Sequence, residues 1–191
     1  MSDLLLHYNG TYSENAGVSK VLLSLGKQLK VEKTEVSYLY GYGSKNSYLK
    51  LLKGKFHLLH YTPITALLFA RWFFGKRFDV VYSHCPESAF DVIVTRFLLG
   101  AKYKVVVHLH GLDVVVRSEW KKEVASGSID YSFKTDLYLL TSVFKSWFAF
   151  KFADSFVAVS NVVAFEAKEL YGVEAKIILN SVDCNDFEVK K

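Results

Sequence analysis

Cysteine and proline are both scarce in this chain of 191 residues, each occurring only twice. Cys85 and Cys184 provide neither a disulfide framework nor the ligand spacing of a structural zinc site, so we expect reduced thiols in a cytoplasmic protein. Pro63 and Pro86 each stand between a predicted strand and a predicted helix, where the missing N–H of a first helical residue costs nothing.

Long apolar runs are also missing. The nearest, from Ile64 to Phe74, is interrupted by Arg71 and falls short of the roughly 18 residues that a membrane span needs. The amino terminus has no basic region before an apolar run, so we expect no secretory signal. With 51% hydrophobic and 23% charged residues, the chain is expected to form one packed domain that is soluble or lies on a membrane.

Acidic residues are absent from one long stretch. Between Val36 and Phe78 there is no Asp or Glu, but there are seven Lys or Arg residues, more than the whole net charge of +5. Aromatic and leucine residues are interleaved with them, which is typical of a surface that meets anionic lipid headgroups. We expect this surface to include Lys50, Lys53, Lys55, Arg71, Trp72, Lys76 and Arg77. A merely solvated basic face is the alternative, and nucleic-acid binding has no supporting motif.

Short β-rich runs alternate with longer helical segments along the chain. The predicted strands are residues 4–8, 36–40, 56–61, 79–83, 104–109, 156–159 and 176–179. The predicted helices are residues 17–29, 62–74, 86–99, 137–153 and 161–171, and a polar segment at 117–131 is expected to be a mobile loop. This alternation predicts an α/β fold, a Rossmann-like three-layer α/β/α sandwich with a mainly parallel sheet of about seven strands. Ligands bind such sheets beyond the carboxyl ends of the strands.

Small and polar residues follow the first and fourth predicted strands. Ala16 and Gly17 open the first helix, whose free N–H groups suit a phosphate, although Gly17 alternatively serves only helix packing. Ser83, His84 and Glu87 follow the fourth strand. A partly buried, hydrogen-bonded role is the alternative for His84, and favourable interaction with the helix dipole is the alternative for Glu87.

Two histidines end the fifth predicted strand, which is the most strongly β-branched. His110 is expected to be functional, because a histidine at this edge can stabilise charge that develops in a transition state. His108 shares its face of the strand, so a metal site has to be considered. We expect no metal, because the spacing reveals no third ligand, and a structural role is the alternative for His108.

Five segments carry a resemblance to a known family. They are residues 15–20 (Asn-Ala-Gly-Val-Ser-Lys), 79–84 (Asp-Val-Val-Tyr-Ser-His), 108–113 (His-Leu-His-Gly-Leu-Asp), 153–160 (Ala-Asp-Ser-Phe-Val-Ala-Val-Ser) and 179–183 (Leu-Asn-Ser-Val-Asp). In this order they resemble the amino-terminal domain of glycosyltransferase family 4. Two departures are Ala16, where the family has a first glycine, and residues 179–183, which lack the family's proline and glycine.

The resemblance implies half of a GT-B fold: a Rossmann-like domain at residues 1–184, and a tail at 185–191 leading to an absent carboxyl-terminal donor-binding domain. It implies a retaining, metal-independent hexosyl-type transferase that uses a nucleotide-sugar as co-substrate and no cofactor. His110 matches the family's catalytic histidine, and Ala16 and Gly17 match its donor-phosphate glycines. The expected acceptor-binding residues are Tyr12, Asn15, Ser83, His84, Glu87, Gly111, Asp113 and Ser160.

The acceptor is expected to be a glycan or a lipid-linked sugar, and the protein to be cytoplasmic, peripheral on the inner face of the cell membrane. We expect the chain alone to be inactive, with the donor domain supplied in cis or by a partner chain. The alternatives are a non-catalytic binding subunit and a free-standing nucleotide-binding Rossmann-like module. The sugar, the acceptor and the oligomeric state are left open by the sequence.

Overall fold

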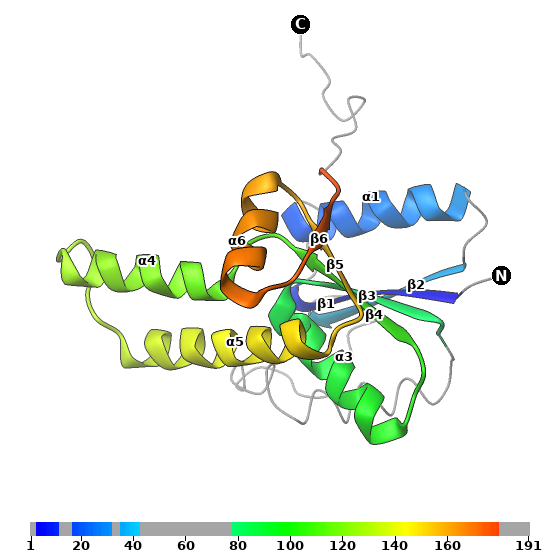
Figure 1. Ribbon diagram of the computed structural model, residues 1–191, viewed down its shortest axis with the longest axis horizontal. Helices are drawn as coiled ribbons and strands as arrows, with labels where there is room; N and C mark the ends of the chain where they lie inside the picture. The colour runs from blue at the N-terminus through cyan, green and yellow to red at the C-terminus, as the bar shows by residue number, and fades with distance from the viewer. Residues whose placement is uncertain (1–2, 12–16, 32–34, 43–77, 180–191) are drawn as a thin grey trace, which may run out of the picture.

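The fold is an α/β sandwich, seen in a computed structural model that describes residues 3–11, 17–31, 35–42 and 78–179 (Figure 1). The described elements are β1 (Asp3–Thr11), α1 (Gly17–Val31), β2 (Glu35–Tyr42), β3 (Val80–His84), α3 (Pro86–Leu99), β4 (Lys104–Leu109), α4 (Asp113–Ala125), α5 (Phe133–Phe152), β5 (Ser155–Ala158), α6 (Asn161–Tyr171) and β6 (Ala175–Ile177). The strand expected at 56–61, the helix expected at 62–74 and the whole basic surface lie outside these residues.

The six described strands form one sheet in the order β2-β1-β3-β4-β5-β6, and every pairing between them is parallel. The expectation of a parallel sheet is confirmed, with six strands described instead of about seven. After β1 the chain passes to β2 on one side and later to β3 on the other. The carboxyl ends of β1 and β3 therefore flank the point where the strand order reverses, which is where open α/β sheets bind their ligands.

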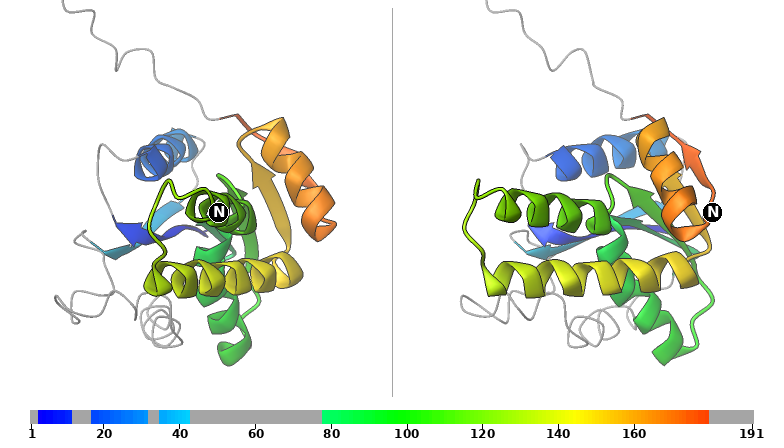
Figure 2. Two further views of the ribbon diagram at one scale, coloured as in Figure 1. Left: turned by 90° about the vertical axis from the view of Figure 1, so that its left-hand side faces the viewer. Right: turned by 60° about the vertical axis from the view of Figure 1, so that its left-hand side comes forward.

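Helices cover both faces of the sheet (Figure 2). Successive side chains of a strand point to opposite faces, so neighbouring residues belong to different cores. On one face, Leu5 and the buried valines of β3 and β4 pack with α3, α5 and α6. On the other face, Leu6 packs with Leu22 of α1. The predicted three-layer α/β/α arrangement is therefore correct.

The ends of the helices follow local sequence signals. Pro86 begins α3, and Gly100 ends it with a left-handed backbone (φ 58°). At α6 the Ser160 hydroxyl accepts a hydrogen bond from the N–H of Val163 (3.2 Å), and Gly172 ends the helix with a φ of 69°. A side chain at either glycine would be strained in this conformation. These starts and ends of the helices match the sequence expectations.

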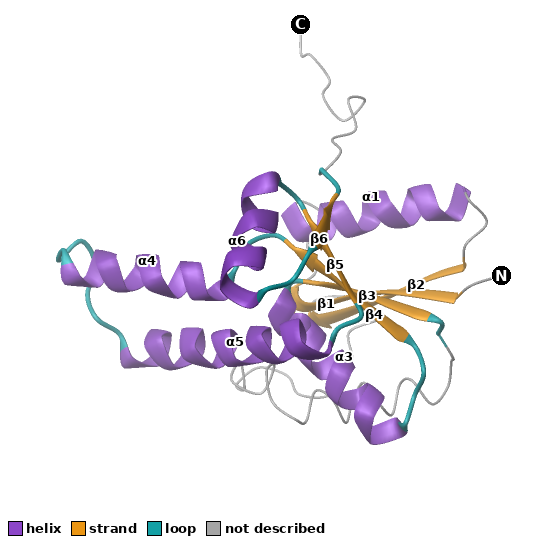
Figure 3. Ribbon diagram, in the orientation of Figure 1, coloured by secondary structure: helices purple, strands orange, loops and turns teal. Residues whose placement is uncertain are grey.

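The segment 117–131 is not a loop along most of its length, so that prediction was wrong. It contains most of α4, which lies beside α5 (Figure 3). No side chain of α4 is fully buried, so the helix shows no apolar periodicity that would have predicted it. The helix is held by Val114 and Val115, which pack against the core, and by the guanidinium group of Arg117, which donates to Asp136 of α5 at 2.8 Å. None of the described helices combines the length and apolar character of a membrane-spanning segment.

Candidate active site

Four of the residues expected at the site stand where a strand ends. Gly17 begins α1 after β1, His84 is the last residue of β3, His110 follows β4 directly, and Ser160 follows β5. Because all these strands are parallel, their carboxyl ends lie at one edge of the sheet. The other expected residues at the start of α1, Tyr12, Asn15 and Ala16, lie outside the described part of the chain.

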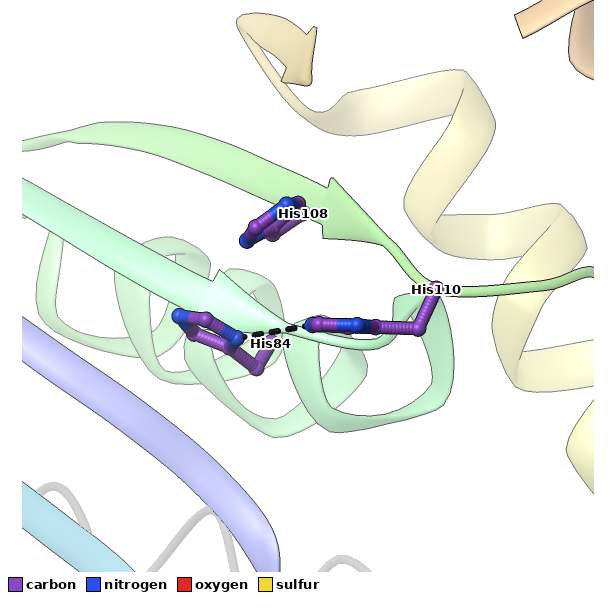
Figure 4. A group of neighbouring side chains, drawn as sticks. All are labelled: His84, His108 and His110. Atoms are coloured by element: carbon purple, nitrogen blue, oxygen red, sulfur yellow. Dashed lines mark hydrogen bonds between the residues drawn. The ribbon is translucent and has the colours of Figure 1, made fainter. Parts of the chain in front are cut away.

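Three histidines gather at this edge (Figure 4). His84 of β3 is the register partner of His108 of β4, and His110 comes two residues later. His84 Nδ1 and His110 Nε2 lie 2.9 Å apart in a hydrogen bond. The ring centroids of His84 and His108 are 4.8 Å apart, and those of His108 and His110 are 4.5 Å apart. Two neighbouring strands therefore hold the three imidazoles as one group.

His84 and His108 are buried, and the pKa values of His108 and His110 are lowered. His84 is fully buried and His108 is only 4% exposed. Burial, with a smaller contribution from His110, lowers the pKa of His108 to about 3. Burial also lowers the pKa of His110. In the His84–His110 hydrogen bond one ring donates and the other accepts, so the bond constrains which nitrogen of each ring carries a proton.

The structure corrects two sequence interpretations here. His84 is not partly buried but wholly buried, and its hydrogen-bond partner is His110. The sequence spacing revealed no third candidate ligand beside His108 and His110, but the structure brings a nitrogen of His84 to within 4.8 Å of theirs. The spacing along the sequence does not reveal this neighbour, because the contact depends on which strands are adjacent.

A sharp turn joins β3 to α3 beside the histidines. Cys85 has a positive φ of 70°, a conformation that a residue with a Cβ adopts only under strain. Its backbone N–H donates to the carbonyl oxygen of His108 at 2.9 Å, which holds the turn against β4. Burial raises the pKa of the Cys85 thiol well above its usual value, so this cysteine is not an activated thiolate.

A second polar group lies where α3, α4 and α5 meet. Burial raises the pKa of Glu87 to about 8, and the nearby carboxylate of Asp113 raises it as well. Asp113 accepts a hydrogen bond from the hydroxyl of Ser146 on α5. Burial lowers the pKa of Lys145 to about 8, although the carboxylates of Asp91 and Glu87 act in the opposite direction. Glu87 and Asp113 were expected at the site from the sequence.

Sequence analysis missed the other members of this polar group. Asp91 is fully buried, Lys145 is 3% exposed and Ser146 is 1% exposed. Asp91 and Lys145 are charged residues inside segments that were interpreted as apolar helices packed on the sheet. A buried charge is costly unless it has partners, so such isolated charged positions were the available signal. Their proximity to Glu87 could not be inferred, because they come from different helices.

An apolar pocket of about 350 Å³ lies beside this polar group. It is lined by Val114, Leu140, Val143, Phe144, Trp147, Leu170 and Tyr171, from α4, α5 and α6. Among the aromatic residues of α5, Phe150 is buried in the core, whereas Phe144 and Trp147 are exposed. Val114 directly follows Asp113, so the pocket adjoins the first residue of α4.

The raised pKa of Glu87 makes a prediction about folding stability. Between about pH 4.5 and pH 8 the folded chain keeps a proton on Glu87 that the unfolded chain releases, so the free energy of unfolding falls as pH rises. Glu87→Gln removes this proton uptake. Between about pH 5 and pH 8, we expect the free energy of unfolding to fall in both proteins, as measured by urea unfolding. The fall is expected to be smaller in the variant than in the wild type by at least about 1 kcal/mol.

A matched control for this prediction is Glu119→Gln, which replaces an exposed glutamate of α4. It is expected to keep the pH dependence of the wild type. A Glu87→Gln variant whose stability falls as steeply as that of the wild type would show that Glu87 is ionised in the folded chain.

Comparison with known proteins supports the architecture. A family model for Glycosyltransferase Family 4 matches residues 16–186. A comparison with curated proteins finds no match. Among solved structures, the chain is similar to the lipopolysaccharide outer core galactosyltransferase WaaB in its apo form, with 12% identity and a TM-score of 0.61, over 93% of this chain and 44% of that one.

Two further solved structures share the fold. The sucrose-phosphate synthase tll1590 of Thermosynechococcus elongatus has 12% identity and a TM-score of 0.63, over 94% of this chain and 47% of that one. Alr3699/HepE of Anabaena, in complex with UDP-glucose, has 17% identity and a TM-score of 0.56, over 97% of this chain and 45% of that one.

This chain therefore spans about half the length of the solved structures that it matches, as expected for one Rossmann-like half of a GT-B fold. The match to the family model extends over most of the sequence and includes the described strands from β3 to β6. The chain belongs to glycosyltransferase family 4.

Proposed function

We propose that this chain is the acceptor-binding domain of a retaining glycosyltransferase, which moves a hexosyl-type sugar from a nucleotide-sugar to a glycan or a lipid-linked acceptor. The observation that carries the proposal is the position of His110, in a family 4 domain, directly after the inner strand β4 and hydrogen-bonded to His84. Transfer needs neither a metal nor a cofactor in this proposal, because neutral side chains and the donor domain stabilise the developing charge.

His110 is the proposed catalytic residue, and His84 positions it. If His84 Nδ1–H donates to His110 Nε2, the Nδ1–H of His110 is available to donate to the reacting sugar. The lowered pKa of His110 keeps the ring neutral, so it acts as a hydrogen-bond donor and not as a cation. The strand and the buried partner ring hold it in place before the substrates arrive, which avoids reorganisation during the reaction.

The donor is proposed to bind across a cleft between this domain, residues 1–184, and a second domain supplied in cis after residues 185–191 or by a partner chain. Ala16 and Gly17 would lie against the donor phosphates at the start of α1, where free N–H groups favour an anion. Similarity to a structure that contains UDP-glucose supports a nucleotide-sugar donor. Closure of the cleft would exclude water from the transfer step.

The acceptor is proposed to contact Glu87, Gly111, Asp113 and Ser160, together with Tyr12 and Asn15. Glu87 and Asp113 supply a carboxylic acid and a carboxylate that can bind sugar hydroxyls. Ser83 and His84 are wholly buried, so they would act through their neighbours unless the site opens. The adjoining apolar pocket, with Phe144 and Trp147 exposed beside it, supports an acceptor that carries a lipid.

Because such an acceptor lies in a membrane, we also propose that the protein binds peripherally to the inner face of the cell membrane. The basic stretch between Val36 and Phe78 supports this, because each Lys or Arg near an anionic bilayer contributes on the order of 1 kcal/mol. The chain would meet the surface without crossing it.

The test is a transfer assay with the purified chain, a panel of radiolabelled nucleotide-sugars and a membrane lipid extract, with and without a family 4 donor-binding domain. We expect no labelled product from the chain alone, because half of the donor site is missing, and product when a matching donor domain is added. Sugar transfer by the chain alone would contradict the proposed division of labour. Tight nucleotide binding without any transfer in either mixture would instead favour a free-standing nucleotide-binding module.

A further inference from the structure

The histidine group at the carboxyl edge has a chemistry that the proposed transfer reaction does not use. We propose that His84, His108 and His110 form a binding site for a divalent transition metal ion that prefers nitrogen ligands, with zinc as its representative. This inference goes beyond the proposed function, and its test does not depend on sugar transfer.

The first support is the geometry of the donor atoms. Each ring offers one nitrogen, and these nitrogens all lie within 4.8 Å of one another. In a tetrahedral zinc site with Zn–N bonds of about 2.0–2.1 Å, the ligand nitrogens lie about 3.3 Å apart. His84 Nδ1 and His110 Nε2 are already 2.9 Å apart, so small ring rotations bring the set to this spacing. The paired strands β3 and β4 fix the backbones of the first two ligands.

The second support is the state of His108. It is 4% exposed, and neither of its ring nitrogens has a hydrogen-bond partner in the part of the chain that the structure describes. A buried polar group without a partner is unfavourable, and most such groups in proteins are satisfied. A metal ion would engage one of the two nitrogens.

The third point is the chemistry of the ligand set, which excludes some metal ions and leaves one coordination position open. Three imidazoles with no carboxylate suit zinc, cobalt, nickel or copper, whereas magnesium and calcium prefer oxygen ligands. Three protein ligands leave a fourth position for water or a small ligand. His110 is the most exposed of the three ligands. In the proposed reaction a bound metal would occupy a ring nitrogen of His110, so metal binding and sugar transfer would compete.

The test titrates the untagged full chain, first treated with EDTA, with zinc chloride and separately with magnesium chloride by calorimetry. We expect one zinc ion per chain and no magnesium binding. His110→Gln removes one ligand next to the end of β4 and is expected to weaken zinc binding by at least about 100-fold. Cobalt should give the visible absorption of a tetrahedral site in the wild type and lose it in the variant.

The matched control is the double variant His57→Gln/His60→Gln, which removes two histidines that lie outside the described residues. It is expected to bind zinc as the wild type does. Zinc affinity that is unchanged in His110→Gln, or lost in the double variant, overturns the proposal. So does a wild-type chain that binds no zinc, which would leave the histidines as a hydrogen-bonded and stacked cluster.

A measurement on the wild type covers the case in which His110→Gln does not fold, as judged by circular dichroism. The X-ray absorption spectrum of the zinc-loaded chain is expected to show three imidazole ligands at about 2.0–2.1 Å. A sulfur ligand, or a shell made mainly of oxygen, overturns the proposal.

Discussion

His110→Ala is expected to lower kcat by about 10²–10³-fold, the loss seen when one donor that stabilises transition-state charge is removed. The measurement is steady-state transfer by the chain together with its donor domain, in EDTA-containing buffer so that no metal occupies the histidines. Removal of the ring also frees His84 from its 2.9 Å hydrogen bond, so we expect the free energy of unfolding to fall by only about 1 kcal/mol.

The split between activity and stability is what makes this test informative. Urea unfolding of the same variant gives the stability, and a rise in KM without a fall in kcat would assign His110 to substrate binding instead. If activity is lost only in proportion to the folded fraction, His110 has a packing role and the proposed catalytic role is wrong.

Lys145→Met is expected to lower the free energy of unfolding by about 3–5 kcal/mol, the usual cost of removing one member of a buried group of charges. Lys145 interacts electrostatically with Asp91, which is fully buried, and with Glu87. Without the ammonium group, the Asp91 carboxylate keeps its cost of desolvation and loses the charge that compensates it. The measurement is urea unfolding near neutral pH.

Two further variants separate charge from packing. Lys134→Met, at an exposed position of the same helix α5, is expected to change stability by no more than about 0.5 kcal/mol. Adding Asp91→Asn to Lys145→Met is expected to recover much of the loss, because the uncompensated charge is then gone. A single variant as stable as the wild type would show that Lys145 is neutral in the folded chain.

The sheet and most helix boundaries could be predicted from the sequence because their signals are local. The β-branched run at Val105–Val107, Pro86 at the start of α3 and Gly172 after α6 each depend only on the residues nearby. The helix α4 could not be predicted in the same way. It buries no side chain fully, and it is held in part by an ion pair to a residue on another helix.

The residues of the candidate site also fall into those that have a local sequence signal and those that do not. His110 and Glu87 were expected because each follows a strand end, which the sequence reveals directly, and Asp113 was expected from the family resemblance. The approach of His84 to His108 depends on the register of β3 against β4, and the approach of Lys145 to Asp91 depends on how α5 packs against α3. A single sequence contains no direct signal for contacts between elements that are far apart along the chain.

The absence of fully buried side chains on α4 has a consequence for how such a protein diversifies. Apart from Val114 and Val115, which pack against the core, substitutions along this helix are expected to cost little stability. Its first residue, Asp113, nevertheless belongs to the proposed acceptor site, and Val114 lines the neighbouring apolar pocket. Mutations can therefore accumulate on α4 and change the proposed acceptor preference. The sheet, with the proposed catalytic residue at its edge, stays intact.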